Sequence, residues 1–392
     1  MTKSNNTGQG LSTRLINTGR DPSRQNGAVN PPTHRASTIV LETAEELYSA
    51  PRTYGIRGGQ VHDELKAALC ALEKAKHCIL TESGLLACTL PIFTFVGAGD
   101  HLLVPDNSYG PTRRYCDRSL QRTGGSVTYY DSDIGAGIAD LIQDNTKLLI
   151  IETPGSLTFE VPDTKALIAV AQARGVKTVL DNCWGSGVYL NPLEMGVDMS
   201  VLATTKYAAG HSDSLSGAIL TKDRAIATAL ENASSDLGLC LSPEDASIVL
   251  RGLRTMAVRL KRHEASGLEI AKWLSQHPNV DRVLHPGLPD DRYHALWQRD
   301  FTGSAGLFSF VLKSGDIKTA NAFLNALSLF GLGFSYGGYE SLAIVCDPQM
   351  QRTVKETDFA GPVIRLAIGL EDPEDLIADL ENGFAAIRSS ST

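Results

Sequence analysis

The chain has 392 residues with 42% hydrophobic content, and its formal net charge is −8 at pH 7. This length predicts two domains, at about 100–200 residues each, around a large buried core. The acidic balance argues against a nucleic-acid-binding surface, which would require clustered Lys and Arg side chains.

The N-terminal 58 residues show little periodicity and contain many Pro, Gly, Asn and Arg residues. We predict an extended N-terminal arm here, without the apolar segment that a signal peptide requires. Helical spacing of apolar residues begins within 62–75, and a second helix is expected to start at Ser83 and Gly84. The longest apolar stretch, 85–96, is well short of the ~20 residues of a membrane span. We therefore expect a cytoplasmic protein without a membrane contact.

Apolar strands then alternate with helices over the next 140 or so residues of the chain. Helices are predicted at 111–125 and 163–175, and strands at 101–105, 126–130, 147–154, 176–182, 199–205 and 217–220. Strands that are apolar throughout and separated by helices are typical of a mostly parallel sheet covered on both faces. This part of the chain is therefore expected to form a large α/β domain.

A long helix, predicted from about 243 to 276, leads out of this domain into a different pattern. Strands at 306–313 and 363–371 are each followed by a helix, at 316–327 and 373–387. We predict a smaller α+β domain here. The expected division is an arm at 1–58, a large domain at 59–256 and a small domain at 257–392.

The cysteines and histidines give no pattern of a metal site. The seven cysteines are scattered and form no C-x-x-C pair, so we expect reduced, mostly buried thiols and no bound metal. His211 follows a lysine in the segment "KYAAGHSD", where a hydrogen-bonded structural histidine is the expected role.

Ligands of parallel α/β sheets bind beyond the carboxyl ends of the strands, where three residues of this chain are unusual. The strands end on Glu152, on Asp181 and near Lys206. Alone, Asp181 is more typical of a turn and Lys206 of a solvated loop. Together they suit pyridoxal phosphate, which needs a lysine for its aldehyde and an acid for its pyridine nitrogen.

Further residues could complete such a site. The backbone N–H groups of a helix that starts near Gly84 and Leu85 could bind the phosphate, with a hydroxyl from Thr205. Tyr109 follows a strand end, where its ring could stack on a cofactor or merely cover the core. Arg365 lies in an apolar strand, where either a substrate carboxylate or an acid of the protein could pair with it.

The motifs that carry these residues also resemble a known family. The segments "SGLLACTLPIF", "DHLLVPDNSYGPT", "DNCWGSGVYLNPLEMGVDMSVLATTKYAAGHSDSLSGAIL", "LRGLRTMAVRL", "FSYGGYESL" and "VIRLAIGLED" are similar to the Cys/Met-metabolism family of pyridoxal-phosphate enzymes. The resemblance extends from about residue 12 to 388. It implies an aspartate-aminotransferase-like (type I) fold with a mostly parallel sheet in the large domain. The segment "ETPGSLTFEVPD" is similar to the cystathionine β-lyase branch of bacteria.

The resemblance implies a role for each matching residue. Lys206 would be the Schiff-base lysine and proton carrier, Asp181 would pair the pyridine nitrogen, and Tyr109 would stack on the ring. The phosphate would be bound by the helix start and the lysine motif, at Ser83, Gly84, Leu85 and Thr205. The substrate would be bound by Arg365, Ser335, Tyr336 and Tyr54. Tyr54, with Arg57, would reach the phosphate of a neighbouring subunit, which makes at least a dimer necessary and a tetramer the usual assembly.

Three positions depart from the family pattern. The arginine expected two residues after Tyr54 is Ile56, and Arg57 follows it, so either Arg57 takes over the contact with the phosphate or the cofactor is held more weakly. The serine expected before the lysine motif is Ala203, which removes one phosphate hydroxyl. Tyr336 replaces a tryptophan that is frequent in the β-lyases, which changes the wall of the substrate pocket.

The activity that the resemblance implies is β-elimination of L-cystathionine to homocysteine, pyruvate and ammonia, a step of methionine biosynthesis. Alternatives within the family are a cysteine desulfhydrase or S-alkylcysteine lyase, and a γ-carbon enzyme such as cystathionine γ-synthase or methionine γ-lyase. A non-catalytic protein that kept the fold is a further alternative. The intact set of Lys206, Asp181, Tyr109 and Arg365 argues against it.

Overall fold

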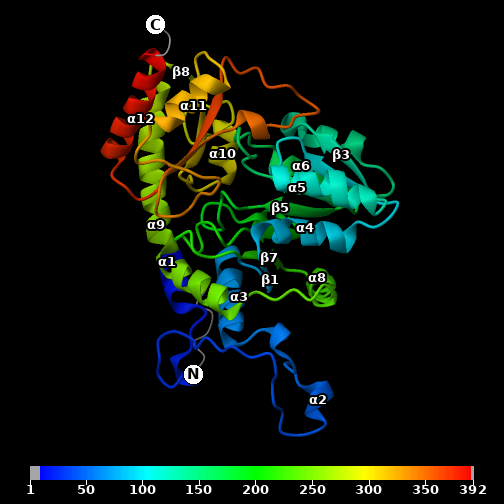
Figure 1. The fold of residues 1–392 in the computed structure, drawn as a ribbon. Helices are drawn as coiled ribbons and strands as arrows, with labels where there is room; N and C mark the ends of the chain where they lie inside the picture. The colour runs from blue at the N-terminus through cyan, green and yellow to red at the C-terminus, as the bar shows by residue number, and fades with distance from the viewer. Residues whose placement is uncertain (1–8, 390–392) are drawn as a thin grey trace.

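The structure is a computed structural model that describes residues 9–389. The first eight residues of the predicted arm and residues 390–392 of the predicted small domain lie outside the described residues. Two β-sheets organise the molecule, with a projecting N-terminal segment below the larger one in Figure 1. Within 9–389, no helix is both long enough and apolar enough for a membrane crossing.

The large sheet has seven strands in the order β1-β7-β6-β5-β4-β2-β3. The strands β2 to β6 are mutually parallel, whereas β7 pairs antiparallel with both β6 and β1. Their bounds are His77–Thr81, His101–Pro105, Ser126–Tyr130, Thr146–Glu152, Lys177–Asp181, Met199–Leu202 and Gly217–Thr221 for β1 to β7. The prediction of a mostly parallel α/β sheet is therefore confirmed, and β1 is a strand that the sequence analysis missed.

Helices cover both faces of this sheet because its strands are apolar on both sides. Neighbouring residues such as Leu102 and Leu103 point into two different core clusters. One cluster includes residues of α4, α5 with the turn after it, and α8, whose bounds are Gly84–Phe95, Gly110–Tyr115 and Arg224–Asp236. The other includes α3 (Gln60–Glu73), α6 (Thr164–Ala173) and part of α9 (Pro243–Ser275).

The small sheet has five strands in the order β10-β11-β12-β9-β8. All neighbours pair antiparallel except β10 and β11, which are parallel. The bounds of β8 to β12 are Val280–Leu284, Leu307–Leu312, Gly331–Leu332, Leu342–Val345 and Val363–Ala367. Its core cluster includes residues of α11 (Ile317–Asn325), α12 (Pro373–Ser389) and the C-terminal half of α9. We keep the division at residues 58 and 256 as a proposal, with the second boundary inside one continuous helix.

Part of the arm differs from the extended segment that the sequence predicts. Residues Leu11–Asn17 form the helix α1, because Leu15 is buried against the core and Arg254 on α9 donates hydrogen bonds to carbonyl oxygens at the helix end. Beyond it the chain projects from the body, with the short helix α2 (Glu46–Ser49) and the 3-10 turns Pro22–Arg24 and Gly55–Arg57. The other elements that the sequence analysis missed include α8, α10 (His294–Asp300), β8 and β11.

Candidate active site

Lys206 lies in the turn that follows β6, at the carboxyl end of the large sheet. Its Nζ atom donates a hydrogen bond of 2.9 Å to Oγ of Ser335 and lies 4.6 Å from the ring centroid of Tyr336. Burial lowers the pKa of Lys206 to about 8, and the positive charge of Arg365 acts in the same direction. A lysine with this pKa supplies a neutral, nucleophilic amine close to physiological pH.

Asp181 ends the neighbouring strand β5, in register with Val201 of β6. One carboxylate oxygen accepts a hydrogen bond of 3.0 Å from the N–H of Cys183, and the other accepts from the thiol of Cys88 at 3.4 Å. The charge of Asp181 also raises the pKa of Lys206, against the effect of burial. The structure therefore brings the carboxylate and the amine together at adjacent strand ends.

The helix α4 begins beside the turn that carries the lysine. Ser83 caps this helix, because its Oγ accepts a hydrogen bond of 3.1 Å from the N–H of Leu86. The N–H groups of Gly84 and Leu85, in the first turn, have no acceptor within the helix. Glycine is required at 84, since a Cβ atom there would lie 2.4 Å from the Cβ of Ala203. The positive end of α4 thus directly abuts the lysine turn.

The hydroxyl of Thr205 is already engaged within the chain. It donates to the carbonyl oxygen of Ser216 at 3.0 Å and accepts from the N–H of the same residue at 2.9 Å. With Ala203 in place of a serine, neither position offers an uncommitted hydroxyl proton. The backbone N–H groups at the start of α4 and the hydroxyl proton of Ser83 therefore stay open as donors at this end of the site.

Tyr109 lies where the loop after β2 enters α5, and its side chain is half-exposed. Its backbone N–H donates a hydrogen bond of 2.7 Å to Oε2 of Glu152. Burial raises the pKa of its phenol, and the charge of Asp181 adds to that rise. These interactions place the tyrosine on the side of the site where Asp181 lies.

Arg365 lies on β12 of the small sheet, and its guanidinium reaches the lysine through one residue. Its Nη2 donates a hydrogen bond of 3.2 Å to the carbonyl oxygen of Ser335, whose hydroxyl accepts from Lys206. Its Nε is buried without a partner, and no carboxylate of residues 9–389 forms an ion pair with it. The structure therefore gives no support to the alternative in which an acid of this chain pairs with Arg365.

Two other predicted residues of the site lie on the projecting arm. Tyr54 and Arg57 are exposed, and neither side chain makes a hydrogen bond or ion pair within the described part of the chain. Ile56, which stands in the usual arginine position, is partly buried between them. Among residues 9–389, no contact brings Tyr54 or Arg57 to Lys206.

Residues 12–385 match the model of one protein family, described as Cys/Met metabolism PLP-dependent enzyme. The chain belongs to this family. The match extends over nearly the whole described chain, including both sheets and the lysine turn. Pyridoxal phosphate is therefore the cofactor.

Curated relatives of this family member cover almost its full length. A putative cystathionine beta-lyase of Rhizobium johnstonii is 49% identical, with 96% of each chain aligned. The cystathionine beta-lyase MetC of Escherichia coli is 41% identical, over 96% of this chain and 98% of the relative. An L-alanine/L-glutamate racemase of Wolbachia pipientis is 37% identical, over the same shares. The crystal structure of metB from Corynebacterium glutamicum superimposes with a TM-score of 0.90 at 30% identity, covering 96% of this chain and 98% of that one.

The family member also contains site residues that sequence reasoning missed. Cys88 and Cys183 both bind Asp181, and Glu152 lies in register with it on β4. The sequence placed Glu152 at the end of a strand, but it indicated no role for this residue. Cys88 gave no signal, because its contact with Asp181 depends on how α4 packs on the sheet, whereas Cys183 contacts Asp181 locally, through its backbone N–H two residues further on.

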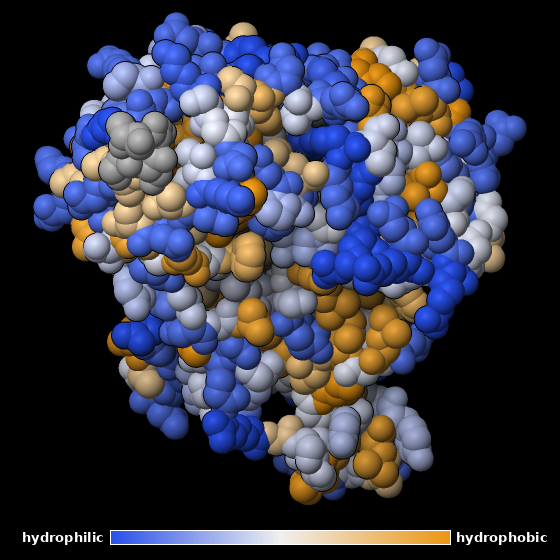
Figure 2. Space-filling model, turned by 45° about the horizontal axis from the view of Figure 1, so that its top comes forward, coloured by the Kyte–Doolittle hydropathy of each residue, from blue (hydrophilic) through white to orange (hydrophobic). Residues whose placement is uncertain are grey.

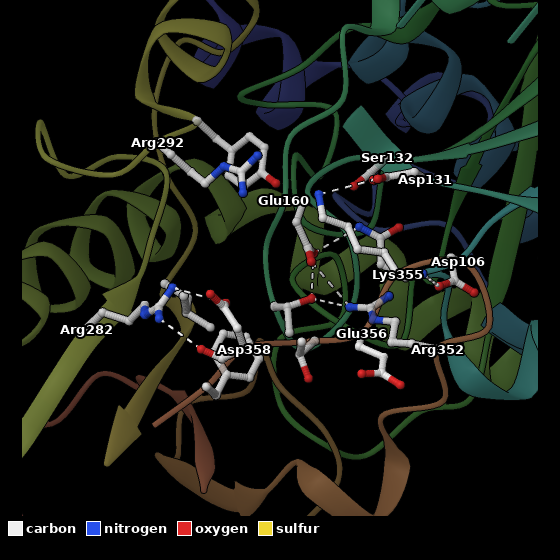
Figure 3. A pocket seen from close by; sticks show the side chains of 16 residues that line it. Asp106, Asp131, Ser132, Glu160, Arg282, Arg292, Arg352, Lys355, Glu356 and Asp358 are labelled. Atoms are coloured by element: carbon white, nitrogen blue, oxygen red, sulfur yellow. Dashed lines mark hydrogen bonds and ion pairs between the residues drawn. The ribbon is translucent and has the colours of Figure 1, made fainter. Parts of the chain in front are cut away.

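A hollow of the surface, separate from the site around Lys206, lies between the two sheets (Figure 3). It is open to solvent, and none of Lys206, Asp181 and Arg365 lines it. Its cations have acid partners: Arg352 pairs with Glu160, Arg292 pairs with Asp133, and Lys355 pairs with both Asp131 and Asp133. These pairs connect the small-sheet part of the chain to the large-sheet part, and they leave no unbalanced cation for a ligand among these three.

Proposed function

We propose that this protein is a carbon–sulfur lyase that cleaves L-cystathionine at its β-carbon, releasing homocysteine, pyruvate and ammonia. The observation that carries the proposal is the bridge through Ser335. It holds a buried amine, Lys206, next to an unpaired guanidinium, Arg365. Relatives named cystathionine beta-lyase, at 49% and 41% identity, support this choice of substrate.

The residues present fit pyridoxal phosphate. The unpartnered N–H groups at the start of α4 suit its phosphate, and Asp181 suits its ring nitrogen. The orphaned Nε of Arg365 suits the carboxylate of an amino acid. When bound, the cofactor supplies an electron sink for the negative charge that proton removal leaves at the substrate Cα. Lys206 would hold it through its aldehyde and Tyr109 would stack on its ring.

The residues of the chain would bind the substrate and move its proton. Arg365, fixed by Ser335, would orient the substrate by its α-carboxylate. The Nζ atom of Lys206 would accept the proton of Cα, which its pKa of about 8 allows near neutral pH, and deliver it to the departing sulfur. Asp181 would keep a proton on the ring nitrogen, and the donors to both of its oxygens would hold that carboxylate in place.

The proposal includes at least a dimer, with a tetramer as the expected assembly. Tyr54 and Arg57 would bind the phosphate in a neighbouring subunit, with Arg57 in place of the arginine missing at 56. The arm forms a separate lobe with apolar atoms on its surface, at the lower right of Figure 2. Val40 and Tyr48 on this arm are 91% and 95% exposed, which favours burial against a second chain. We also propose a cytoplasmic location, which the seven unpaired cysteines support.

The test is a substrate panel with identification of the keto acid. The purified holoenzyme is given cystathionine, cystine, S-methylcysteine, methionine and L-alanine. We expect cystathionine to be turned over most efficiently, with pyruvate and homocysteine in equal amounts and no product from the K206A variant. Formation of 2-oxobutyrate would instead indicate a γ-carbon enzyme. A preference for cystine or S-methylcysteine would indicate a desulfhydrase or S-alkylcysteine lyase, and D-alanine without pyruvate would indicate a racemase.

A further inference from the structure

Glu152 is a buried acid beside the proposed cofactor site. The mechanism above assigns no role to this residue. It ends β4, which lies between β2 and β5 in the large sheet, and it is in register with Asp181. The strand ends on its two sides therefore carry the two groups expected to contact the pyridine ring, Tyr109 and Asp181. No ion pair to Glu152 is formed within residues 9–389.

Both oxygens of Glu152 accept hydrogen bonds from loops of the site. Oε2 accepts from the backbone N–H of Tyr109 at 2.7 Å, and Oε1 accepts from the hydroxyl of Ser156 at 2.6 Å. The two loops are also joined to each other, since the N–H of Ser156 donates to the carbonyl oxygen of Asn107 at 3.0 Å. A Cβ atom on Gly155 would lie 2.0 Å from the Asn107 side chain, so these loops meet without spare room. One carboxyl group thus holds two loops.

Tyr109 needs such a support because its side chain is half-exposed. Its ring lies at the start of α5, where the backbone direction decides where the ring points. The bond from its own N–H to Glu152 fixes that direction on the side of the loop that faces Asp181. Burial and the charge of Asp181 raise the pKa of Glu152 to about 8, so a proton on Glu152 relieves the repulsion between the two acids.

We propose that Glu152 is a positioning residue of the cofactor site, which fixes the backbone of Tyr109 and the Ser156 turn and thereby sets the position of the Tyr109 ring beside Asp181. The inference rests on the proposed function only in taking Tyr109 as the stacking residue. It concerns residues of the chain itself, so its test includes measurements that need no turnover.

The first test compares three variants of Glu152 in the cofactor-free protein by hydrogen exchange of backbone amides. E152Q keeps an oxygen that can accept from the Tyr109 N–H, whereas E152L fills similar space without any acceptor. We expect the Tyr109 amide to exchange at least about tenfold faster in E152L and to return to within about threefold of the wild-type rate in E152Q. The amides of Thr112 and Arg113, which bond to the carbonyl of Tyr109, are the internal control. E152A is the second variant without an acceptor, if E152L does not fold.

The second test measures binding of pyridoxal phosphate and coupling to Tyr109. We expect the Kd of the cofactor and its induced circular dichroism to change in E152L and to be rescued in E152Q. Turnover should fall about 10–100-fold in E152L, because a misplaced group next to the reacting centre costs that much. If Glu152 acts through the tyrosine, the double variant E152L/Y109A should bind the cofactor no more weakly than Y109A alone.

Two results would overturn this role for Glu152. One is an unchanged exchange rate of the Tyr109 amide in both E152L and E152A. The other is a set of additive effects of E152L and Y109A, which would mean that Glu152 acts independently of the tyrosine. Neither result depends on which amino acid the enzyme cleaves, so a failure of the proposed substrate would be seen separately, in the keto-acid panel.

Discussion

Lys206 and Ser335 are joined by a hydrogen bond of 2.9 Å across the two sheets of the molecule. The lysine follows β6 of the large sheet, whereas the serine lies between β10 and β11 of the small one. The two chain segments also pack closely beside this bond. Gly337 adopts φ +81°, and a Cβ atom there would lie 2.8 Å from the N atom of Tyr207. The amine and the proposed carboxylate-binding Arg365 are therefore held together only when the two sheets keep their relative position.

Replacement of Lys206 should abolish lyase activity even when the positive charge is kept. In K206A the amine is lost, and in K206R the guanidinium stays protonated at all relevant pH values, so it can neither bond to an aldehyde nor take up a proton. We expect a loss of at least ~10²–10⁴-fold in kcat for both variants, the range of general acid–base catalysis. Steady-state kinetics check this, with borohydride trapping of the cofactor as a control of attachment. A K206R enzyme within tenfold of wild type would contradict the role.

The lowered pKa of Lys206 should govern how fast the cofactor-free protein takes up pyridoxal phosphate. Only the neutral amine attacks an aldehyde, and its fraction rises with pH until the pKa of about 8 is passed. The uptake rate should therefore increase up to about pH 8 and then level. Since the charge of Arg365 contributes to the lowered pKa, R365Q should move the plateau to higher pH while R365K should not. A rate that still rises steeply above pH 9 in the wild type would contradict the low pKa.

The sequence was sufficient to predict the strand that ends at Asp181 and the strand before Lys206. Wholly apolar strands between helices are typical of a parallel sheet. The sequence was not sufficient for the order of those strands. Glu152 could be placed at a strand end, but its position next to Asp181 depends on β4 pairing with β5 and β2, while β3 lies at the edge. The order of the strands along the sequence does not determine how they pair in the sheet.

Contacts between distant segments explain the other differences. The helix α1 is only seven residues long, and it is held by Arg254, about 240 residues further along the chain. The commitment of the Thr205 hydroxyl to Ser216 likewise depends on the chain turning back before β7. Local spacing carries no information on either contact, whereas it located Tyr109 and Gly84 because both lie at the start of a helix.

The buried pair of Asp106 and Arg113 should contribute far more to stability than an exposed pair at the same cleft. Their Oδ1 and Nη1 atoms lie 2.9 Å apart with both side chains buried, and Asp106 also accepts from the N–H groups of Thr353 and Val354. D106N leaves a buried guanidinium without its counter-charge, so we expect a loss of about 3–5 kcal/mol in the free energy of unfolding. Denaturant unfolding of the holoenzyme measures it.

The matched control for D106N is R292Q. Arg292 pairs with Asp133 at 2.6 Å, but its side chain is 65% exposed, so its removal should cost no more than about 1 kcal/mol. Equal losses in the two variants would mean that the buried pair has no special role. Asp106 lies three residues before Tyr109, so D106N should in addition weaken cofactor binding, whereas R292Q should leave it close to wild type.

Glu73, a second fully buried acid, should make the stability of the protein depend on pH. It ends α3, where its Oε1 accepts a hydrogen bond of 2.6 Å from Asn182, and its Oε2 has no partner among the described residues. Burial raises the pKa of Glu73 from 4.5 to about 8. Between these values the folded protein holds a proton that the unfolded chain has released, so this contribution to the free energy of unfolding falls as pH rises and is constant above about pH 8.

The variant E73Q removes this titration while keeping the size of the side chain. The free energy of unfolding of E73Q should therefore rise relative to that of wild type as pH increases from about 5 to 8, by an amount on the order of 3 kcal/mol, and the difference should then stay constant. Glu152 titrates in both proteins, so its contribution cancels in the comparison. E269Q, which changes an exposed glutamate of α9, is the control and should give a difference that does not vary in this way. If the difference between E73Q and wild type were the same at pH 5 and pH 8, Glu73 would be ionised in the folded protein, and its burial would need a cation that residues 9–389 do not supply.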